Sequence, residues 1–170
     1  MQTNQSLMNM ESQTKYPKIF SCEFFPPNTD EGMRKLFAAR EALMRMRPAF
    51  FSVTYGAGGS TRDRTFQAIQ AIQTHSGVDA APHLTCVAST RAGTREILDY
   101  YRAQGIHRVV ALRGDLPSGM REFGEFRYAN ELVEFIRAET GDHFHIEVAA
   151  YPEWQDTTFI AENLDRWLAD

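Results

Sequence analysis

This sequence of 170 residues has little cysteine, no excess of basic charge and no long apolar run, and each shortage argues against a class of protein. Its two cysteines, Cys22 and Cys86, lie in apolar stretches, which disfavours a secreted disulfide scaffold and favours a reducing, cytoplasmic setting. Eighteen basic against twenty-two acidic residues leave a net charge of -4, so neither nucleic acid nor a membrane surface is an expected partner. Apolar runs such as 109–112 are far shorter than the roughly 20 residues of a membrane-spanning helix.

The overall composition is that of an ordinary globular protein, with 43% hydrophobic and 12% aromatic side chains. Residues 1–16 are rich in Gln, Ser, Asn and Met, and they lack the basic and apolar segments of a signal peptide. We therefore expect a disordered leader over 1–16 and a folded domain over 17–170.

From residue 18 onward, short apolar segments alternate with segments of helical periodicity. The predicted strands are apolar on both faces, which favours a parallel sheet covered by helices. The pattern predicts five consecutive βα units of an α/β fold, either an open doubly wound sheet or part of a (β/α)8 barrel. The predicted strands cover 19–25, 50–55, 80–87, 106–112 and 143–150, and the predicted helices cover 30–46, 61–75, 90–104, 128–140 and 157–169.

The glycine-rich loop after the second strand does not identify a nucleotide-binding motif. Residues 56–59 (GAGG) lack the G-x-G-x-x-G spacing, and no Gly-Lys-Ser/Thr follows as in a phosphate-binding P-loop. The loop is suited to offering backbone N–H groups to an anion, and it is equally suited to being an ordinary connection.

Polar side chains recur at the predicted carboxyl ends of the strands. This edge binds ligands in parallel α/β folds, so recurrence in five units predicts a ligand site there. We expect the opposite edge, at the amino ends of the strands, to carry no comparable set of polar side chains. The residues concerned are Glu23, Thr54, Tyr55, His83, Thr85, Arg113, Gly114, Asp115, Tyr151 and Glu153.

Glu23 is the candidate acid of this site. It lies between Cys22 and Phe24, and an apolar setting would favour its protonated form and make it a general acid. The alternative is a glutamate at a strand end that forms a salt bridge or faces solvent.

Two other features also have competing interpretations. Residues 113–117 (RGDLP) place Asp115 after a glycine, where Arg113 can pair with it or bind phosphate, yet the segment is equally a good turn. His83 lies in an apolar strand, where a histidine is more often a hydrogen-bonded core residue than a ligand.

No metal site is expected, because no suitable partner stands at ligand spacing. The phenylalanines expected in the core are Phe24, Phe25, Phe50, Phe51 and Phe66.

At these residues the sequence resembles methylenetetrahydrofolate reductase, the bacterial flavin-dependent type. Five motifs occur in the family's order and spacing, which makes the resemblance far more specific than any single motif. The matching segments are 23–27 (EFFPP), 52–57 (SVTYGA) with 62–65 (RDRT), 81–86 (APHLTC), 111–117 (ALRGDLP) and 148–153 (VAAYPE).

The resemblance implies a (β/α)8 TIM barrel that binds FAD at the carboxyl ends of its strands. It also implies an oxidoreductase in which NADH or NADPH reduces the flavin, and 5,10-methylenetetrahydrofolate is reduced to 5-methyltetrahydrofolate. This reaction belongs to one-carbon metabolism and methionine biosynthesis. The implied partners are the folate substrate and a nicotinamide nucleotide, and a complete barrel is expected to form a homo-oligomer.

The resemblance also implies a role for individual residues. Glu23 matches the general acid that protonates a nitrogen of the folate's five-membered ring. Asp115 matches an aspartate that tunes the flavin potential and hydrogen-bonds the folate, and Thr54 matches a residue at the nicotinamide face of the flavin. Matches to FAD-contacting residues are Tyr55, Ala57, His83, Arg113, Gly114 and Tyr151, with Tyr128 and Ala129 on a loop over the cofactor.

The resemblance weakens after Glu153. Residues 155–158 (QDTT) replace a His-Pro-Glu-type stretch, and Leu164 falls near the position of an expected aspartate. Five of the eight units cannot close a barrel sheet. We therefore expect the N-terminal part of a TIM-barrel reductase domain. The alternative is a truncated, non-catalytic homologue that binds partners or is unstable alone.

Overall fold

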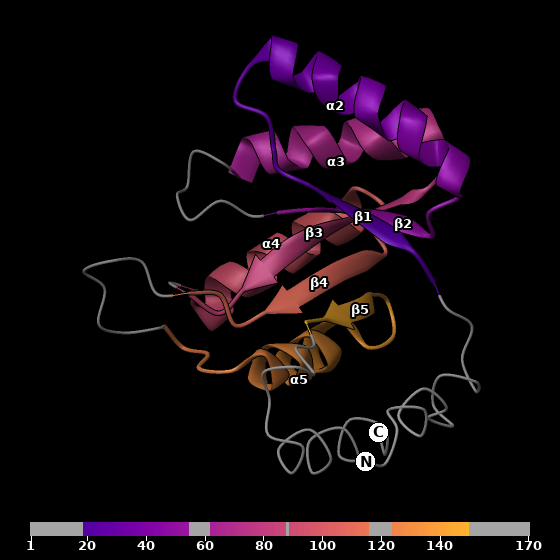
Figure 1. The fold of residues 1–170 in the computed structure, drawn as a ribbon. Coiled ribbons are helices and arrows are strands. Elements are labelled where there is room, and N and C mark those ends of the chain that lie inside the picture. Colours follow the sequence, from indigo (N-terminus) through magenta and orange to yellow (C-terminus); the bar gives the residue numbers. More distant parts are fainter. Residues whose placement is uncertain (1–18, 55–61, 88, 116–123, 150–170) are drawn as a thin grey trace, which may run out of the picture.

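The computed structural model describes residues 19–54, 62–87, 89–115 and 124–149, in which helices and strands alternate (Figure 1). The predicted helix over 157–169 and the predicted leader over 1–16 lie outside the described residues. The elements in chain order are β1 (Ser21–Phe24), α2 (Asp30–Leu43), the 3-10 helix η2 (Met44–Met46), β2 (Phe50–Val53), α3 (Arg62–Ser76), β3 (Asp79–Thr85), α4 (Arg91–Ala103), β4 (Arg108–Leu112), α5 (Ala129–Thr140) and β5 (His145–Val148).

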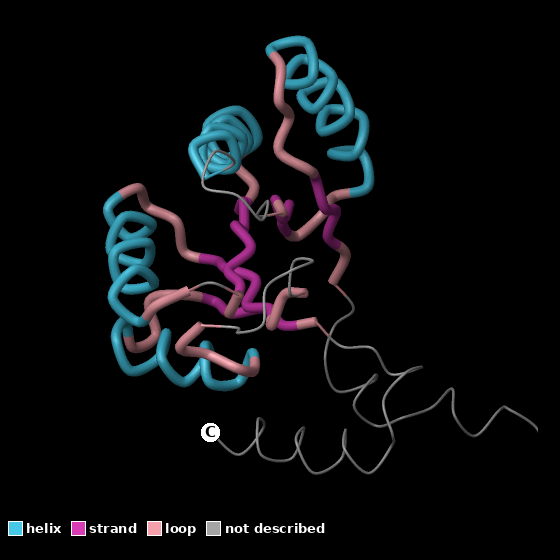
Figure 2. Tube along the Cα trace, turned by 90° about the vertical axis from the view of Figure 1, so that its left-hand side faces the viewer, coloured by secondary structure: helices cyan, strands magenta, loops and turns pink. Residues whose placement is uncertain are grey.

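The five strands form one parallel sheet in the order β1-β2-β3-β4-β5. Each strand pairs with the one before it, whereas a doubly wound sheet reverses its order at a switch point. The consecutive order is that of a TIM barrel, and it decides between the two predicted architectures. Figure 2 shows the helices in an arc around the outside of the strands.

Local side-chain and backbone features fix the ends of α2 and α4. Thr29 precedes α2, and its Oγ1 accepts a hydrogen bond from the Gly32 N–H at 3.0 Å. Thr90 caps α4 in the same way, through the Gly93 N–H at 3.0 Å. Gly105, two residues after the end of α4, has φ +69°, a backbone conformation that residues other than glycine rarely adopt.

The core lies between the sheet and the helices. Side chains alternate along each strand, so one face of the sheet carries the apolar residues that pack on the helices. The prediction that Phe25 belongs to this core is wrong, since its side chain is 77% exposed. Its neighbour Phe24 packs against the core, so Phe25 projects to the other side, just beyond the end of β1. Fully buried core residues include Phe51, Val53, Ile69, Ile72, Leu98, Val109, Ala111, Leu132 and Ile136.

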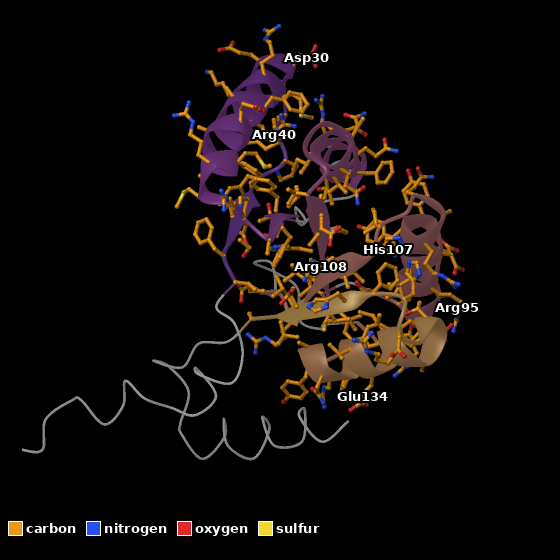
Figure 3. All side chains as sticks on the ribbon, turned by 90° about the vertical axis from the view of Figure 1, so that its right-hand side faces the viewer. Asp30, Arg40, Arg95, His107, Arg108 and Glu134 are labelled. Carbon is orange, nitrogen blue, oxygen red and sulfur yellow. The ribbon has the colours of Figure 1, made fainter. Side chains whose placement is uncertain are left out.

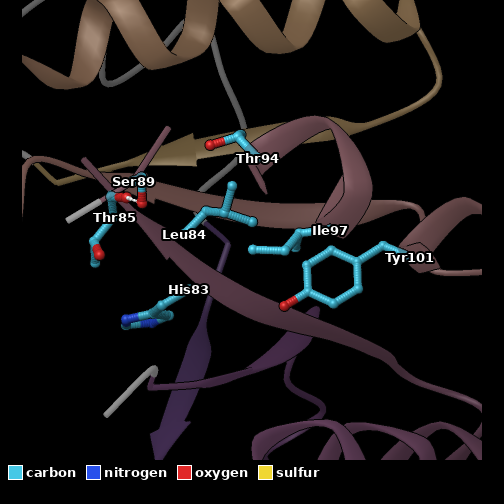
Figure 4. A pocket seen from close by; sticks show the side chains of 7 residues that line it. All are labelled: His83, Leu84, Thr85, Ser89, Thr94, Ile97 and Tyr101. Atoms are coloured by element: carbon cyan, nitrogen blue, oxygen red, sulfur yellow. Dashed lines mark hydrogen bonds between the residues drawn. The ribbon is translucent and has the colours of Figure 1, made fainter. Parts of the chain in front are cut away.

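The other face of the sheet, which we call the polar face, carries ionisable residues. The register aligns Glu23 with Ser52, His83 with Val110, and Val110 with Glu147, so these positions share one face. Figure 4 shows the side chains of His83 and Leu84 leaving β3 on opposite sides. The helices α2, α3, α4 and α5 thus cover one face and leave the polar face to form the site.

Candidate functional site

Glu23 and His83 meet on the polar face. Glu23 comes from β1, His83 comes from β3, and Ser52 of the intervening strand is aligned with Glu23. The Glu23 Oε2 atom lies 3.4 Å from His83 Nε2. The Glu23 side chain is 50% exposed, whereas that of His83 is only 8% exposed. The two candidate residues therefore form a contact between a buried imidazole and a solvent-accessible carboxyl group.

The burial of His83 determines its charge. Removal from water lowers the pKa of the imidazole below its usual value, and the nearby Glu23 carboxylate partly opposes that shift. The ring is therefore mostly uncharged at neutral pH. Its buried Nε2 atom makes no hydrogen bond to any described residue, because the contact with Glu23 is close but not aligned. The expectation of a core histidine holds for its burial.

The expected apolar environment of Glu23 is not what the structure shows. Cys22 and Phe24 flank Glu23 in the sequence, but their side chains pack against the helix-covered core. Glu23 projects to the polar face, where half of its side chain is exposed. Its arrangement is closer to the alternative considered from the sequence, a strand-end glutamate that faces solvent, here beside a neutral imidazole.

The turn after β4 brings the backbone close to the end of β3. Gly114 has φ +76°, and a Cβ atom there would lie 3.0 Å from Val87 Cγ2 and 3.1 Å from Thr85 Cβ. Glycine is therefore required both by conformation and by space. Beside it, Arg113 Nη2 lies 3.9 Å from Asp115 Oδ1, as the sequence suggested. The Asp115 side chain is fully exposed, so this ion pair adds little stability and leaves the carboxylate available to a ligand.

Two hydrogen bonds that involve the backbone N–H and carbonyl groups of Thr54 hold this residue in place. Its N–H donates to the Phe24 carbonyl oxygen at 2.9 Å, which ties the end of β2 to the end of β1. The buried Thr65 of α3 donates its hydroxyl to the Thr54 carbonyl oxygen at 3.2 Å. Sequence reasoning missed this role of Thr65, although a threonine on an otherwise apolar helix face was the available signal.

Tyr128 and Ala129 lie where the β4–α5 connection enters α5. Tyr128 occupies the position before the helix with its side chain 59% exposed, and Ala129 is the first helical residue. The Cys86 thiol donates to the Tyr128 carbonyl oxygen at 3.3 Å, which joins this connection to the end of β3. The predicted FAD-contacting residues Tyr55, Ala57 and Tyr151 lie outside the described residues.

A small pocket lies between β3 and α4 (Figure 4). Its volume of about 20 Å³ has room for one water molecule and none for a nucleotide. Ser89 closes one end by donating its hydroxyl to the Thr85 carbonyl oxygen at 2.8 Å. A large ligand would therefore lie on the polar face rather than in this pocket. The lining residues are His83, Leu84, Thr85, Ser89, Thr94, Ile97 and Tyr101.

The amino ends of the strands carry a cluster of charged side chains, contrary to the expectation from the sequence. Arg108, the first residue of β4, contacts Glu147 and lies 3.4 Å from Asp79 Oδ2. Its guanidinium also lies 4.7 Å from the centre of the Phe50 ring, and His145 Nε2 is 3.2 Å from Glu147 Oε1. Figure 3 shows Arg108 among the strands, whereas Glu134 lies on the outside of α5. Only the register of four strands brings these residues together.

Two features are absent from the described residues. No group of three or more His, Cys, Asp or Glu side chains is arranged to hold a metal ion in the described part of the chain. Among the helices of the described ranges, none combines the length and apolar character needed to cross a membrane.

Comparisons with known proteins match most of the chain. A family model described as Methylenetetrahydrofolate reductase matches residues 8–167. Proteins named 5,10-methylenetetrahydrofolate reductase from Pectobacterium carotovorum subsp. carotovorum and Escherichia coli (strain K12) are each 44% identical. Each covers 88% of this chain, which spans 48% of the relative, about half its length. An Arabidopsis thaliana protein named methylenetetrahydrofolate reductase (NADH) 1 is 40% identical, with 85% of this chain and 25% of that protein covered.

The fold and these comparisons agree. Five parallel strands in consecutive order, alternating with helices, are partial βα units of the TIM-barrel fold of this family. The family model matches well over half of the chain. This chain therefore belongs to the methylenetetrahydrofolate reductase family.

Proposed function

We propose that this chain supplies the catalytic acid and much of the FAD site for reduction of 5,10-methylenetetrahydrofolate to 5-methyltetrahydrofolate. The observation that carries the proposal is the contact of Glu23 with His83 at 3.4 Å on the polar face, in a chain of this family. The turn at 113–115 also lies at the carboxyl end of the sheet, where barrel enzymes bind their ligands.

Two features of the described residues fit a bound FAD. The close packing of Gly114 against Thr85 and Val87 holds the turn at 113–115 at the carboxyl end of the sheet, next to the polar side chains of the site. The buried His83 Nε2 atom makes no hydrogen bond within the described residues, which marks an unsatisfied polar position at this site. FAD would supply hydride-transfer chemistry. The residues that we assign to its binding are Thr54, His83, Arg113, Gly114, Asp115, Tyr128 and Ala129, with Tyr55, Ala57 and Tyr151 proposed from the sequence.

The exposure of the two carboxyl groups suits different tasks. Glu23 is half exposed, so it can exchange protons with solvent and donate one to a folate nitrogen. Asp115 is fully exposed and offers its oxygens to N–H donors of the folate. Its negative charge also opposes the build-up of further negative charge on a neighbouring ligand. We therefore propose Glu23 and Asp115 as catalytic and substrate-binding residues.

The reductant and the setting of the enzyme are further parts of the proposal. The name of the Arabidopsis thaliana relative includes NADH, so we propose NADH rather than NADPH as the first nucleotide to test. The cysteines Cys22 and Cys86 are free thiols in the structure, which supports a reducing cytoplasm. A homo-oligomer and a role in methionine biosynthesis remain proposals from the family resemblance.

Binding and turnover by the full 170-residue chain test this function. We expect FAD to bind saturably, with a change in the flavin absorbance spectrum and quenching of its fluorescence. Glu23→Gln should retain FAD binding and flavin reduction by NADH, while folate reduction falls about 100-fold or more. Glu134→Gln, which removes an exposed carboxylate from the outside of α5, is the matched control and should change neither.

The possible failures of this experiment have different meanings. If FAD does not bind, the chain is not an autonomous flavoenzyme, and the non-catalytic homologue that binds partners is the better description. If Glu23→Gln reduces folate at the unaltered rate, Glu23 is not the acid. If it abolishes FAD reduction as well, Glu23 has a structural role.

A further inference from the structure

We propose that His83 is a positioning residue for Glu23, in addition to any contact it makes with a cofactor. In this arrangement the neutral imidazole carries its proton on Nε2 and donates it to Oε2 of Glu23. The other carboxyl oxygen, Oε1, is then directed toward the substrate and carries the proton that is donated. This inference rests on the proposed function, because it assigns a second residue to the same proton transfer.

The geometry of the pair supports this assignment. Nε2 and Oε2 lie 3.4 Å apart, a few tenths of an ångström beyond a well-formed hydrogen bond. The Nε2 atom is buried and makes no hydrogen bond within the described residues, a state that is costly for a ring nitrogen. A small rotation of the half-exposed Glu23 side chain would align the carboxyl group and satisfy Nε2. Catalytic hydrogen bonds are often long before a ligand binds and tighten in the complex.

The surroundings keep His83 neutral and leave Glu23 as its partner. Burial lowers the pKa of His83, and Glu23 is the charged residue that acts on it in the opposite direction. From β2, the residue aligned with Glu23 is the uncharged Ser52, which is also aligned with Ala81, two residues before His83 on the same face. Arg108 of β4 and Glu147 of β5 share the polar face, but they form an ion pair with each other. A neutral imidazole suits the proposal because it can donate one proton without adding a positive charge.

Proton transfer is balanced in this arrangement. The Oε1–H bond of Glu23 breaks, a bond forms between that proton and a folate nitrogen, and the negative charge stays on Glu23. His83 keeps its Nε2–H throughout, and its hydrogen bond to Oε2 strengthens as negative charge develops on the carboxylate. Solvent can return a proton to Glu23 because half of its side chain is exposed.

The deciding experiment is NMR of the full chain without added ligands. Nitrogen-15 shifts of the His83 ring should identify the tautomer protonated at Nε2. A pH titration of the same ring should show a lower pKa in Glu23→Gln than in the unaltered protein, because the carboxylate that raises it is lost. Glu134→Gln is the matched control and should leave the titration unchanged. A proton on Nδ1 instead, or a His83 titration that is the same in Glu23→Gln, overturns the proposal.

Kinetics then separate positioning from folding. His83→Leu should lower kcat for folate reduction about tenfold or more, with a much smaller change in KM, because a hydrogen bond to a charged group is lost. His83→Gln retains an N–H donor and should recover most of the rate. Equal loss in both variants contradicts the positioning role. Failure of FAD to bind would contradict the proposed function, whereas the NMR result would still decide whether His83 and Glu23 are coupled.

Discussion

The two ends of the five-stranded sheet differ in how their charged residues are satisfied. At the amino end, Arg108 lies between Asp79 and Glu147 and over the ring of Phe50. At the carboxyl end, Asp115 is fully exposed and Glu23 is half exposed. Ionisable residues on the polar face thus stabilise the sheet at one end and remain available to a ligand at the other.

The difference follows from burial and from the number of partners. The Arg108 side chain is only 16% exposed, so its charge is costly to bury unless carboxylates compensate it. The turn at 113–115 projects beyond β4, where solvent satisfies the charge of Asp115. A paired, buried charge has little left to offer a ligand, whereas an exposed one retains its full capacity for hydrogen bonds. The same division between stability and chemistry is general in TIM barrels.

The largest expected effect is a loss of stability caused by a substitution at the amino end of the sheet. Arg108→Met should lower the free energy of unfolding by about 2–3 kcal/mol, because it leaves Glu147 largely buried without its main cation. Urea denaturation measures this change. Arg102→Met is the matched control, since Arg102 is exposed and lies 3.9 Å from Asp99, and its loss should cost less than about 0.5 kcal/mol. Equal costs in the two variants would show that the Arg108 cluster is not a stabilising feature.

Thiol chemistry tests whether every group at the carboxyl end is accessible. Cys86 follows β3 at that end, yet it is fully buried and its burial raises its pKa from 9.0 to about 11. This shift alone reduces its thiolate about 100-fold relative to an ordinary cysteine, so a disulfide reagent at pH 8 should modify Cys86 at least that much more slowly than an exposed thiol, and more slowly than the partly buried Cys22. Cys22→Ser should remove the fast reaction. A fast reaction in that variant would show that Cys86 is exposed and that this end of the sheet opens readily.

A pair of glycines separates backbone strain from close packing. Gly114→Ala should destabilise the protein by about 1–2 kcal/mol, because it adds strain at positive φ and a contact with Val87 and Thr85. Gly105→Ala shares the positive φ but meets no atom within 4 Å, so it should cost about 1 kcal/mol or less. Urea denaturation of both variants measures the difference. A cost at Gly114 no larger than that at Gly105 would show that the turn can move away from β3.

The parts of this fold that depend on local chemistry could be predicted from the sequence. Capping by Thr29 and termination at Gly105 need only residues within one turn of the chain. The parallel sheet follows from the alternation of apolar strands with helices. Placing Glu23 and His83 at the same edge needed nothing beyond knowing where each strand ends.

The errors arose where a residue's surroundings come from other strands. The apolar neighbours of Glu23 in the sequence project to the opposite face of the sheet, so they do not bury it. The charged cluster around Arg108 needs the register of β3, β4 and β5, which no single strand specifies. The hydroxyl of Thr65 reaches back across the chain to Thr54, a contact that depends on how α3 packs.

The smallest expected effect is the pH dependence of stability that arises from His83. Burial lowers its pKa in the folded state, so below about pH 6.5 the unfolded chain binds a proton that the folded chain excludes. The free energy of unfolding should therefore fall as the pH drops from about 6.5 to the lowered folded value, by at most about 1.4 kcal/mol per pH unit. His83→Gln should remove this component, measured as the difference between urea denaturation curves of the two proteins across that range. A difference that is independent of pH would mean that the imidazole is not desolvated, and the carboxyl end would then contain no buried basic side chain comparable to Arg108.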